Sequence, residues 1–186
     1  LSSDCGLWLG PRGGYNYFIK FARFLEENGN GKLNRNSSDI CTNHKVYCEK
    51  LKTFFLDCQH RFDVNYWKLD GFSARPPQPD PQGNYISGGY QGMYYVTEHW
   101  ERWIDIFQAM RNQRGEKRND LWINLTCYVN PSPWFLQWRN SVWMQNSQDI
   151  GRLNVKRLSQ LDQLLSYRDD RYFDFVKTRA FQFPLA

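Results

Sequence analysis

The chain has 186 residues, a length typical of one domain of roughly 100 to 200 residues. Hydrophobic residues make up 41% of it and charged residues 23%, which argues against a disordered, collagen-like or coiled-coil protein, and no apolar stretch reaches the roughly 18 residues of a membrane span. The net charge of +5 comes from basic residues that alternate with acidic ones, so neither nucleic acid nor a membrane is expected as a partner.

Short apolar runs alternate with amphipathic helical patterns along the chain. The runs at residues 5–9, 65–69, 121–126 and 141–145 are nearly continuous in apolar residues, as the buried strands of a parallel sheet are, and a fifth run begins at Phe181. Apolar positions three or four apart predict helices over residues 18–25, closed by Gly29, over 47–58, over 100–110 behind a Thr97 cap, and over 155–165 behind Asn154. The alternation predicts an α/β fold built from parallel βα units.

The number of strands leaves two architectures open. A closed (β/α)8 barrel needs about 250 residues and eight strands, whereas this chain supplies four strands or five. It is therefore either a small open sheet or an internal segment of a larger barrel, and its start at Leu1 favours a mature protein or an excised piece. Residues 73–92, rich in proline and glycine, are predicted to form a long loop over the active face of this segment.

The cysteines and histidines do not form a recognisable metal motif. Five cysteines, an odd number at irregular spacing, indicate reduced thiols and a cytoplasmic protein, with secretion as the alternative. The group at Cys41, His44, Cys48, Cys58 and His60 lacks the paired Cys-x2-Cys spacing of a zinc site, so no metal is expected.

The first candidate for chemistry lies at the end of the second apolar run. Lys68 and Asp70 are two residues apart, so the period of a strand points both side chains to the same face. The carboxyl ends of parallel strands line the active site in such folds, and an acid with a cation beside it would stay ionised and could act as a nucleophile. The competing interpretation is an aspartate that caps the next turn, with Lys68 as its paired neighbour.

The second candidate is Asp149, which follows the apolar run at 141–145. Alone it is more typical of a turn residue ahead of Gly151. Two carboxylates at the carboxyl ends of strands, surrounded by aromatic rings, are the arrangement of a glycosidase: one nucleophile, one acid/base, and rings to stack on a sugar. The rings are those of Trp67, Trp134, Trp138 and Trp143.

The sequence resembles a family of glycosidases from about residue 6 to residue 151. The run YWKLDGF is similar to the nucleophile strand of the clan D glycoside hydrolases, the alpha-galactosidases and alpha-N-acetylgalactosaminidases of families 27 and 36. The resemblance implies that Asp70 is the nucleophile and that Lys68 binds sugar hydroxyls. The run TCYVNPSPWFLQW resembles the next strand and loop, with Cys127 in the place of a cysteine that touches the sugar, followed by Pro131 and Trp134. The run WMQNSQDIG resembles the acid/base segment, with Trp143 and the acid/base Asp149, and CGLWLGPRGGY resembles the preceding strand. The turn after that strand, at the active face, is where Trp8 and Arg12 are expected to contact substrate.

The resemblance implies the middle of a (β/α)8 TIM barrel, about strands three to six plus the start of the seventh. It also implies a retaining mechanism on an α-linked galactoside, without metal or cofactor. Met144 stands where family 27 has an arginine, so the choice between families 27 and 36 and the substituent at C2 of the sugar stay open. The alternatives are a carbohydrate-binding relative that has lost turnover and a nucleic-acid binder, which the dispersed charge disfavours.

Overall fold

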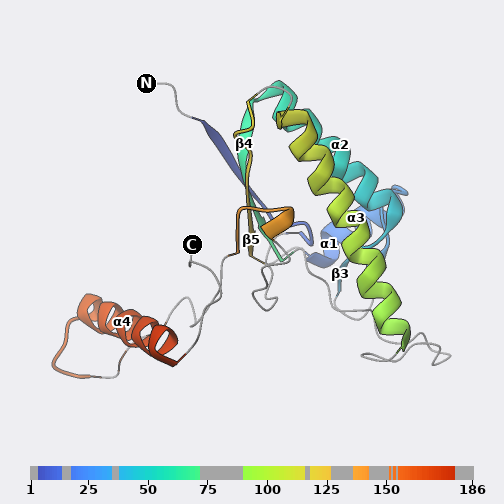
Figure 1. Cartoon of the computed structure of the whole chain (residues 1–186). Helices are drawn as coiled ribbons and strands as arrows, with labels where there is room; N and C mark the ends of the chain where they lie inside the picture. The colour runs from blue at the N-terminus through green and yellow to red at the C-terminus, as the bar shows by residue number, and fades with distance from the viewer. Residues whose placement is uncertain are drawn as a thin grey trace.

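The computed structural model describes residues 4–13, 18–34, 38–71, 90–115, 118–126, 136–142, 151, 153 and 155–178. Its main feature is a parallel four-stranded sheet with the order β1-β4-β5-β6 (Figure 1). The strands are β1 (Cys5–Leu9), β4 (Val64–Asp70), β5 (Trp122–Thr126) and the two-residue β6 (Ser141–Val142). A separate antiparallel pair consists of β2 (Leu33–Asn34) and β3 (Asp39–Ile40).

Helices occupy the connections from β1 to β4 and from β4 to β5. They are α1 (Phe18–Glu27), α2 (Lys45–Arg61) and α3 (Tyr90–Gly115), and a fourth helix, α4 (Gln160–Thr178), follows β6. Figure 1 shows α2 and α3 side by side along one face of the sheet, with α4 apart from it. Each strand of the main sheet thus pairs with the next parallel strand in the chain, which confirms the predicted parallel α/β architecture.

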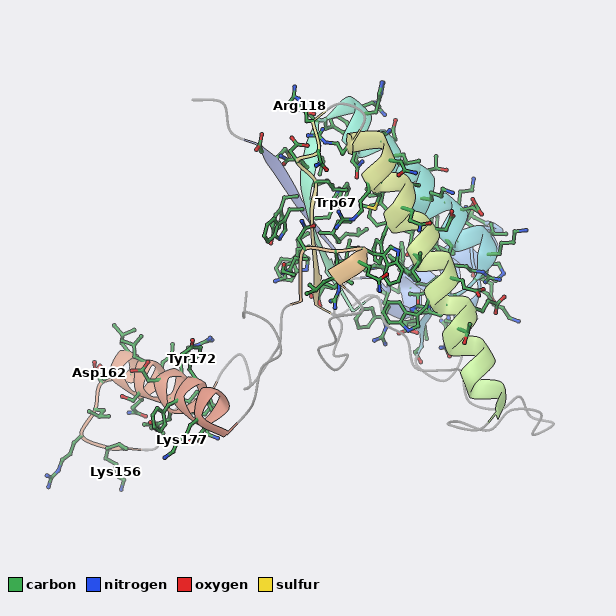
Figure 2. All side chains as sticks on the ribbon, viewed as in Figure 1. Trp67, Arg118, Lys156, Asp162, Tyr172 and Lys177 are labelled. Atoms are coloured by element: carbon green, nitrogen blue, oxygen red, sulfur yellow. The ribbon has the colours of Figure 1, made fainter. Side chains whose placement is uncertain are left out.

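The core lies between the sheet and the pair α2 and α3. Trp67 and Leu69 of β4 are 0% exposed, and the Trp67 ring meets the Phe55 ring edge-on with 4.8 Å between centroids. Figure 2 shows Trp67 between the strands and the helices. The same layer contains side chains from β5 and α3, namely Ile123, Leu125, Trp103, Ile106, Phe107 and Met110. Burial of these apolar side chains is the main stabilisation of the fold.

A buried arginine joins the amino end of the sheet to the end of α3. Arg114 donates from Nε to Asp120 Oδ1 at 3.0 Å and from Nη2 to Asp120 Oδ2 at 2.8 Å, and it also pairs with Asp63. Asp63 immediately precedes β4 and Asp120 lies two residues before β5, so one guanidinium fixes the starts of both strands. The hydrogen bonds from Arg114 hold the pKa values of both carboxyls below their usual range.

Two helix starts differ from the prediction. Helix α3 begins at Tyr90, so Thr97 lies inside the helix and residues 90–92 of the expected loop are helical, while 73–89 lie outside the described residues. Helix α4 begins at Gln160, five residues after Val155, and the hydroxyl of Ser159 caps it by accepting from the Asp162 amide at 3.1 Å. In both regions the apolar spacing was a poor guide to the helix start.

The other strand predictions have mixed outcomes. The strand at 5–9 has the predicted bounds, and those at 65–69 and 121–126 are correct to within one residue at each end. Of the run at 141–145, residues 141 and 142 are a strand, and the rest of it, like the run at Phe181, lies outside the described residues. The strands that the structure describes form an open sheet, and the β2–β3 pair was not predicted at all.

His99 is a core residue. It lies within α3, is 2% exposed and contacts the rings of Trp100 and Trp103. Burial, together with the nearby Arg102 charge, lowers the pKa of the imidazole to about 4. The folded protein therefore holds His99 in its neutral form.

We predict that replacing Trp67 destabilises the fold far more than replacing Trp8. Trp67→Ala should lower the free energy of unfolding by about 3 to 5 kcal/mol, because it empties a fully buried site. Trp8→Ala, the same change at a side chain that is 61% exposed, should cost less than about 1 kcal/mol. Urea unfolding measures both values, and equal losses would contradict the assignment of Trp67 to the core.

His99 should make the fold sensitive to acid. Its pKa is lower in the folded chain than in the unfolded chain. The stabilisation that depends on neutral His99 is therefore complete above pH 6.5 and is lost as the pH falls towards 4. Between pH 7 and pH 4 the wild-type chain should lose about 3 kcal/mol more unfolding free energy than His99→Leu. Urea titrations across this range provide the measurement, and parallel curves for the two proteins would refute the prediction.

Candidate active site

The side of the main sheet away from α2 and α3 carries a mixed aromatic and polar surface, which we call the open face. It is formed by alternate residues of three strands: Trp8 of β1, Tyr66, Lys68 and Asp70 of β4, and Trp122 and Asn124 of β5. Three of its rings are exposed, Trp8 at 61%, Tyr66 at 40% and Trp122 at 45%. The Tyr66 ring lies over Gly6, where a Cβ would lie 3.0 Å from Tyr66 Cδ1, so a larger residue at this position would crowd the ring.

Asp70 is the last residue of β4 and lies at the carboxyl edge of the sheet. It shares a face with Lys68, as the period of two predicted, because Trp67 and Leu69 point the other way into the core. Gly71 follows with a φ of +66°, a left-handed conformation that lets the chain turn away immediately after the carboxylate. The geometry predicted for the pair is therefore present, with Asp70 at the rim and Lys68 one level below it.

Lys68 packs against an aromatic ring. Its Nζ lies 4.2 Å from the centroid of the Trp8 ring, within the range of a cation–π interaction. Trp8 and Lys68 are register partners on neighbouring strands, so this contact follows directly from the pairing of β1 with β4. Two of the predicted substrate contacts thus lie together on the open face.

Arg12 lies in the loop after β1, beside the turn that follows Asp70. A Cβ built on Gly71 would lie 3.8 Å from Arg12 Cδ. The guanidinium forms an ion pair with Asp39 of β3, whose side chain is 3% exposed. Arg12 is therefore at the predicted edge, and its charge is already matched by a buried carboxylate.

A buried tyrosine of α2 holds the same loop in place. Tyr47 of α2 donates its hydroxyl hydrogen to the carbonyl oxygen of Pro11. Burial raises the pKa of Tyr47 above its ordinary value, so the hydroxyl keeps the proton that it donates. The loop at 10–13 is held on two sides by residues that lie about thirty positions later in the chain.

The structure does not bring Trp67 to the site. The sequence interpretation placed its ring among the sugar-stacking side chains, but Trp67 is one residue away from Lys68 and so faces the opposite side of β4, against Phe54 and Phe55. Its role is in the core. The remaining predicted site residues, Asp149, Cys127, Trp134 and Trp143, lie outside the described residues.

Sequence reasoning missed Asn124 and Ser141. Asn124 is the register partner of Lys68 on β5, and its Nδ2 donates to Ser141 Oγ of β6 at 2.7 Å. Trp122 Nε1 donates to the same oxygen at 3.2 Å. The available signal was the period of two in the run at 121–126, which places Trp122 and Asn124 on one face.

The described part of the chain offers no alternative centre of metal chemistry. Within it, no group of three or more His, Cys, Asp or Glu side chains lies close enough together to hold a metal ion. Its four cysteines, Cys5, Cys41, Cys48 and Cys58, are free thiols, and burial raises the pKa of Cys48 to about 12, which disfavours the reactive thiolate. None of the helices in the described ranges is long and apolar enough to cross a membrane.

Comparisons of this chain with protein-family models, with curated proteins and with solved structures found no match. Assignment of a function therefore depends on the residues and geometry of the open face.

Proposed function

We propose that the chain is part of the catalytic barrel of a retaining glycoside hydrolase that cleaves terminal α-linked galactosides or α-N-acetylgalactosaminides. The observation that carries this proposal is the position of Asp70. It ends a parallel strand at the carboxyl edge, on the face away from α2 and α3, with the cation of Lys68 on the same face two residues earlier. This is where folds with parallel strands hold their catalytic groups.

The order of the strands supports the barrel. In a (β/α)8 barrel each strand pairs with the next one in the chain, the helices lie outside and the other face forms the interior. The sequence of pairings β1-β4-β5-β6, with α2 and α3 on one side only, follows the same plan. In that arrangement Tyr66 and Trp122 would fill the interior below the site, while Asp70 and Lys68 would face the substrate.

The proposed reaction has two steps at the anomeric carbon. An Asp70 carboxylate oxygen forms a bond to C1 while the bond from C1 to the departing oxygen breaks, and Asp149 gives its proton to that oxygen. Water then attacks C1 of the glycosyl-enzyme, Asp149 takes the water's proton, and the bond to Asp70 breaks with release of the sugar. Two displacements retain the α configuration. Lys68 binds sugar hydroxyls, and Trp8 supplies a ring for stacking.

A binding function without turnover is the second candidate, because three exposed rings lie on one sheet face. Trp8, Tyr66 and Trp122 present aromatic surface that a sugar could stack on without any reaction. Such a protein would bind galactosides through the same face and would form no covalent intermediate.

Replacement of the proposed nucleophile tests the first candidate. Asp70→Asn should reduce hydrolysis of 4-nitrophenyl α-galactoside by at least about a thousandfold, because an amide cannot form the glycosyl-enzyme. The matched control is Asp105→Asn on α3, an exposed aspartate that pairs with Lys52 and lies outside the open face. It should keep wild-type turnover. Hydrolysis by Asp70→Asn close to the wild-type rate would remove Asp70 from its role.

Trapping the intermediate gives an independent measurement. Incubation with 5-fluoro-α-galactosyl fluoride should add one fluoroglycosyl group to the protein, and peptide mass spectrometry should find it on Asp70. A label on another carboxylate would show that the chain is a glycosidase with a different nucleophile.

Azide separates the enzyme from the binding protein. Asp149→Ala should hydrolyse the nitrophenyl substrate slowly, and azide should restore the rate at least tenfold with α-galactosyl azide as the product, since a small anion can attack C1 without a general base. A protein that only binds sugar has no intermediate for azide to attack. Saturable galactose binding without azide product or fluorosugar label would favour the second candidate.

A further inference from the structure

An ion pair lies at the carboxyl edge, beside the turn that follows the proposed nucleophile. Arg12, in the loop after β1, directs Nε and Nη2 to the same carboxylate oxygen, Oδ2 of Asp39. The Asp39 side chain is 3% exposed, whereas the Arg12 side chain is 31% exposed. Asp39 is therefore the buried member of the pair, and Arg12 is the member that a ligand can reach.

Two further contacts restrict the position of Arg12. Its guanidinium carbon lies 5.7 Å from the centroid of the Phe18 ring, within the range of a cation–π interaction. The preceding residue, Pro11, accepts a hydrogen bond through its carbonyl oxygen from the hydroxyl of Tyr47. The backbone before Arg12 and the guanidinium itself are thus both held by the fold, which lowers the cost of ordering this side chain around a ligand.

The pair leaves hydrogen-bond donors but little net charge. A guanidinium has N–H donors on each of its nitrogens and no acceptor. Nε and Nη2 face Asp39, and in the described part of the chain no residue accepts a hydrogen bond from Nη1. Because a carboxylate in direct contact balances the charge of Arg12, an approaching anion would be attracted by Arg12 and repelled by Asp39 at a similar distance. A neutral hydroxyl oxygen would gain the hydrogen bond without this repulsion.

We infer that Asp39 is a positioning residue for Arg12 and determines what Arg12 binds. Held in this pair, Arg12 Nη1 donates to an uncharged hydroxyl of the substrate and discriminates against sulfate, phosphate and carboxylate groups. Arg12 lies beside the site, since a Cβ built on Gly71 would be 3.8 Å from Arg12 Cδ. The inference rests on the proposed function for the identity of the ligand, a galactoside. The pair and its discrimination against anions can be measured without turnover.

The first measurement follows the Arg12 Nε–H group by NMR. Arg12→Lys identifies its 1H–15N signal by the loss of that signal. Because Nε donates to a buried carboxylate, its hydrogen should exchange slowly with solvent, and Asp39→Asn should raise the exchange rate at least about tenfold, since an amide is a weaker acceptor. The matched control is Asp120→Asn, which removes a carboxylate from the buried Arg114 at the amino edge. It should lower stability and leave the Arg12 signal unchanged.

Titrations of the same signal test the discrimination. Methyl α-galactoside should shift the Arg12 signal of the wild-type chain, and sodium sulfate at constant ionic strength should not. In Asp39→Asn the guanidinium charge is no longer balanced, so sulfate should bind at least about tenfold more tightly than to the wild type. A purely structural role of Asp39 would give lower stability without any gain of anion binding. Should Asp39→Asn fail to fold, the wild-type titrations decide: a response to the galactoside alone supports the inference, and a response to sulfate overturns it.

Kinetics connect the pair to the reaction. Asp39→Asn should raise KM for 4-nitrophenyl α-galactoside about tenfold with less than about a threefold change in kcat, as expected when a ground-state contact is lost. Folded Asp39→Asn without a gain in sulfate affinity would overturn the inference and leave the pair as a structural tie between the β1 loop and β3. A chain that neither hydrolyses nor binds galactosides, yet gains sulfate affinity in Asp39→Asn, would refute the proposed function and leave the positioning of Arg12 by Asp39 intact.

Discussion

The side chains of β4 alternate between the two faces of the sheet, and this alternation decides which residues each face carries. Trp67 and Leu69 are both buried in the core, where the Trp67 ring packs against Phe55 of α2, so Lys68 and Asp70 must point the other way. A slip of one residue in register would bury a lysine and an aspartate against Phe55 and expose a tryptophan and a leucine. Since a charge without a partner is costly in such a core, the packing of Trp67 also fixes the orientation of the candidate catalytic group.

The two edges of the sheet are held by different means. At the amino edge, Arg114 ties the starts of β4 and β5 to α3 through two carboxylates. At the carboxyl edge, the loop after β1 is held by Asp39 through Arg12 and by Tyr47 through a backbone carbonyl. The carboxyl edge thus depends on segments far away in the chain.

The sequence was most informative where a local period decides the structure. The strand at 5–9 and the shared face of Lys68 and Asp70 follow from alternation alone. Contacts between distant residues gave no such signal. The Arg12 and Asp39 pair spans 27 positions, and β2 and β3 are two-residue strands, too short to show a period.

Errors in the sequence interpretation arose where residue type outweighed position. Thr97 resembled a helix cap because it precedes an amphipathic run, yet the helix had already begun at Tyr90. Trp67 was grouped with sugar-stacking rings because it is aromatic, although its neighbour Lys68 already implied that it faces the core. Asn124 lies inside the apolar run at 121–126, and its position beside Lys68 follows only from the register of β4 with β5.

Trp8 has a further consequence for how a sugar could approach the site. One part of its ring is covered by the Lys68 ammonium, and the side chain as a whole is still 61% exposed. A sugar stacked on the exposed part of the ring would lie beside the same cation, so its hydroxyls and the ring would share one ammonium as a neighbour. Because Asp70 is on the same face one level above Lys68, stacking would also bring the sugar towards the carboxylate. Binding of the sugar and attack on it would then use neighbouring side chains of β1 and β4.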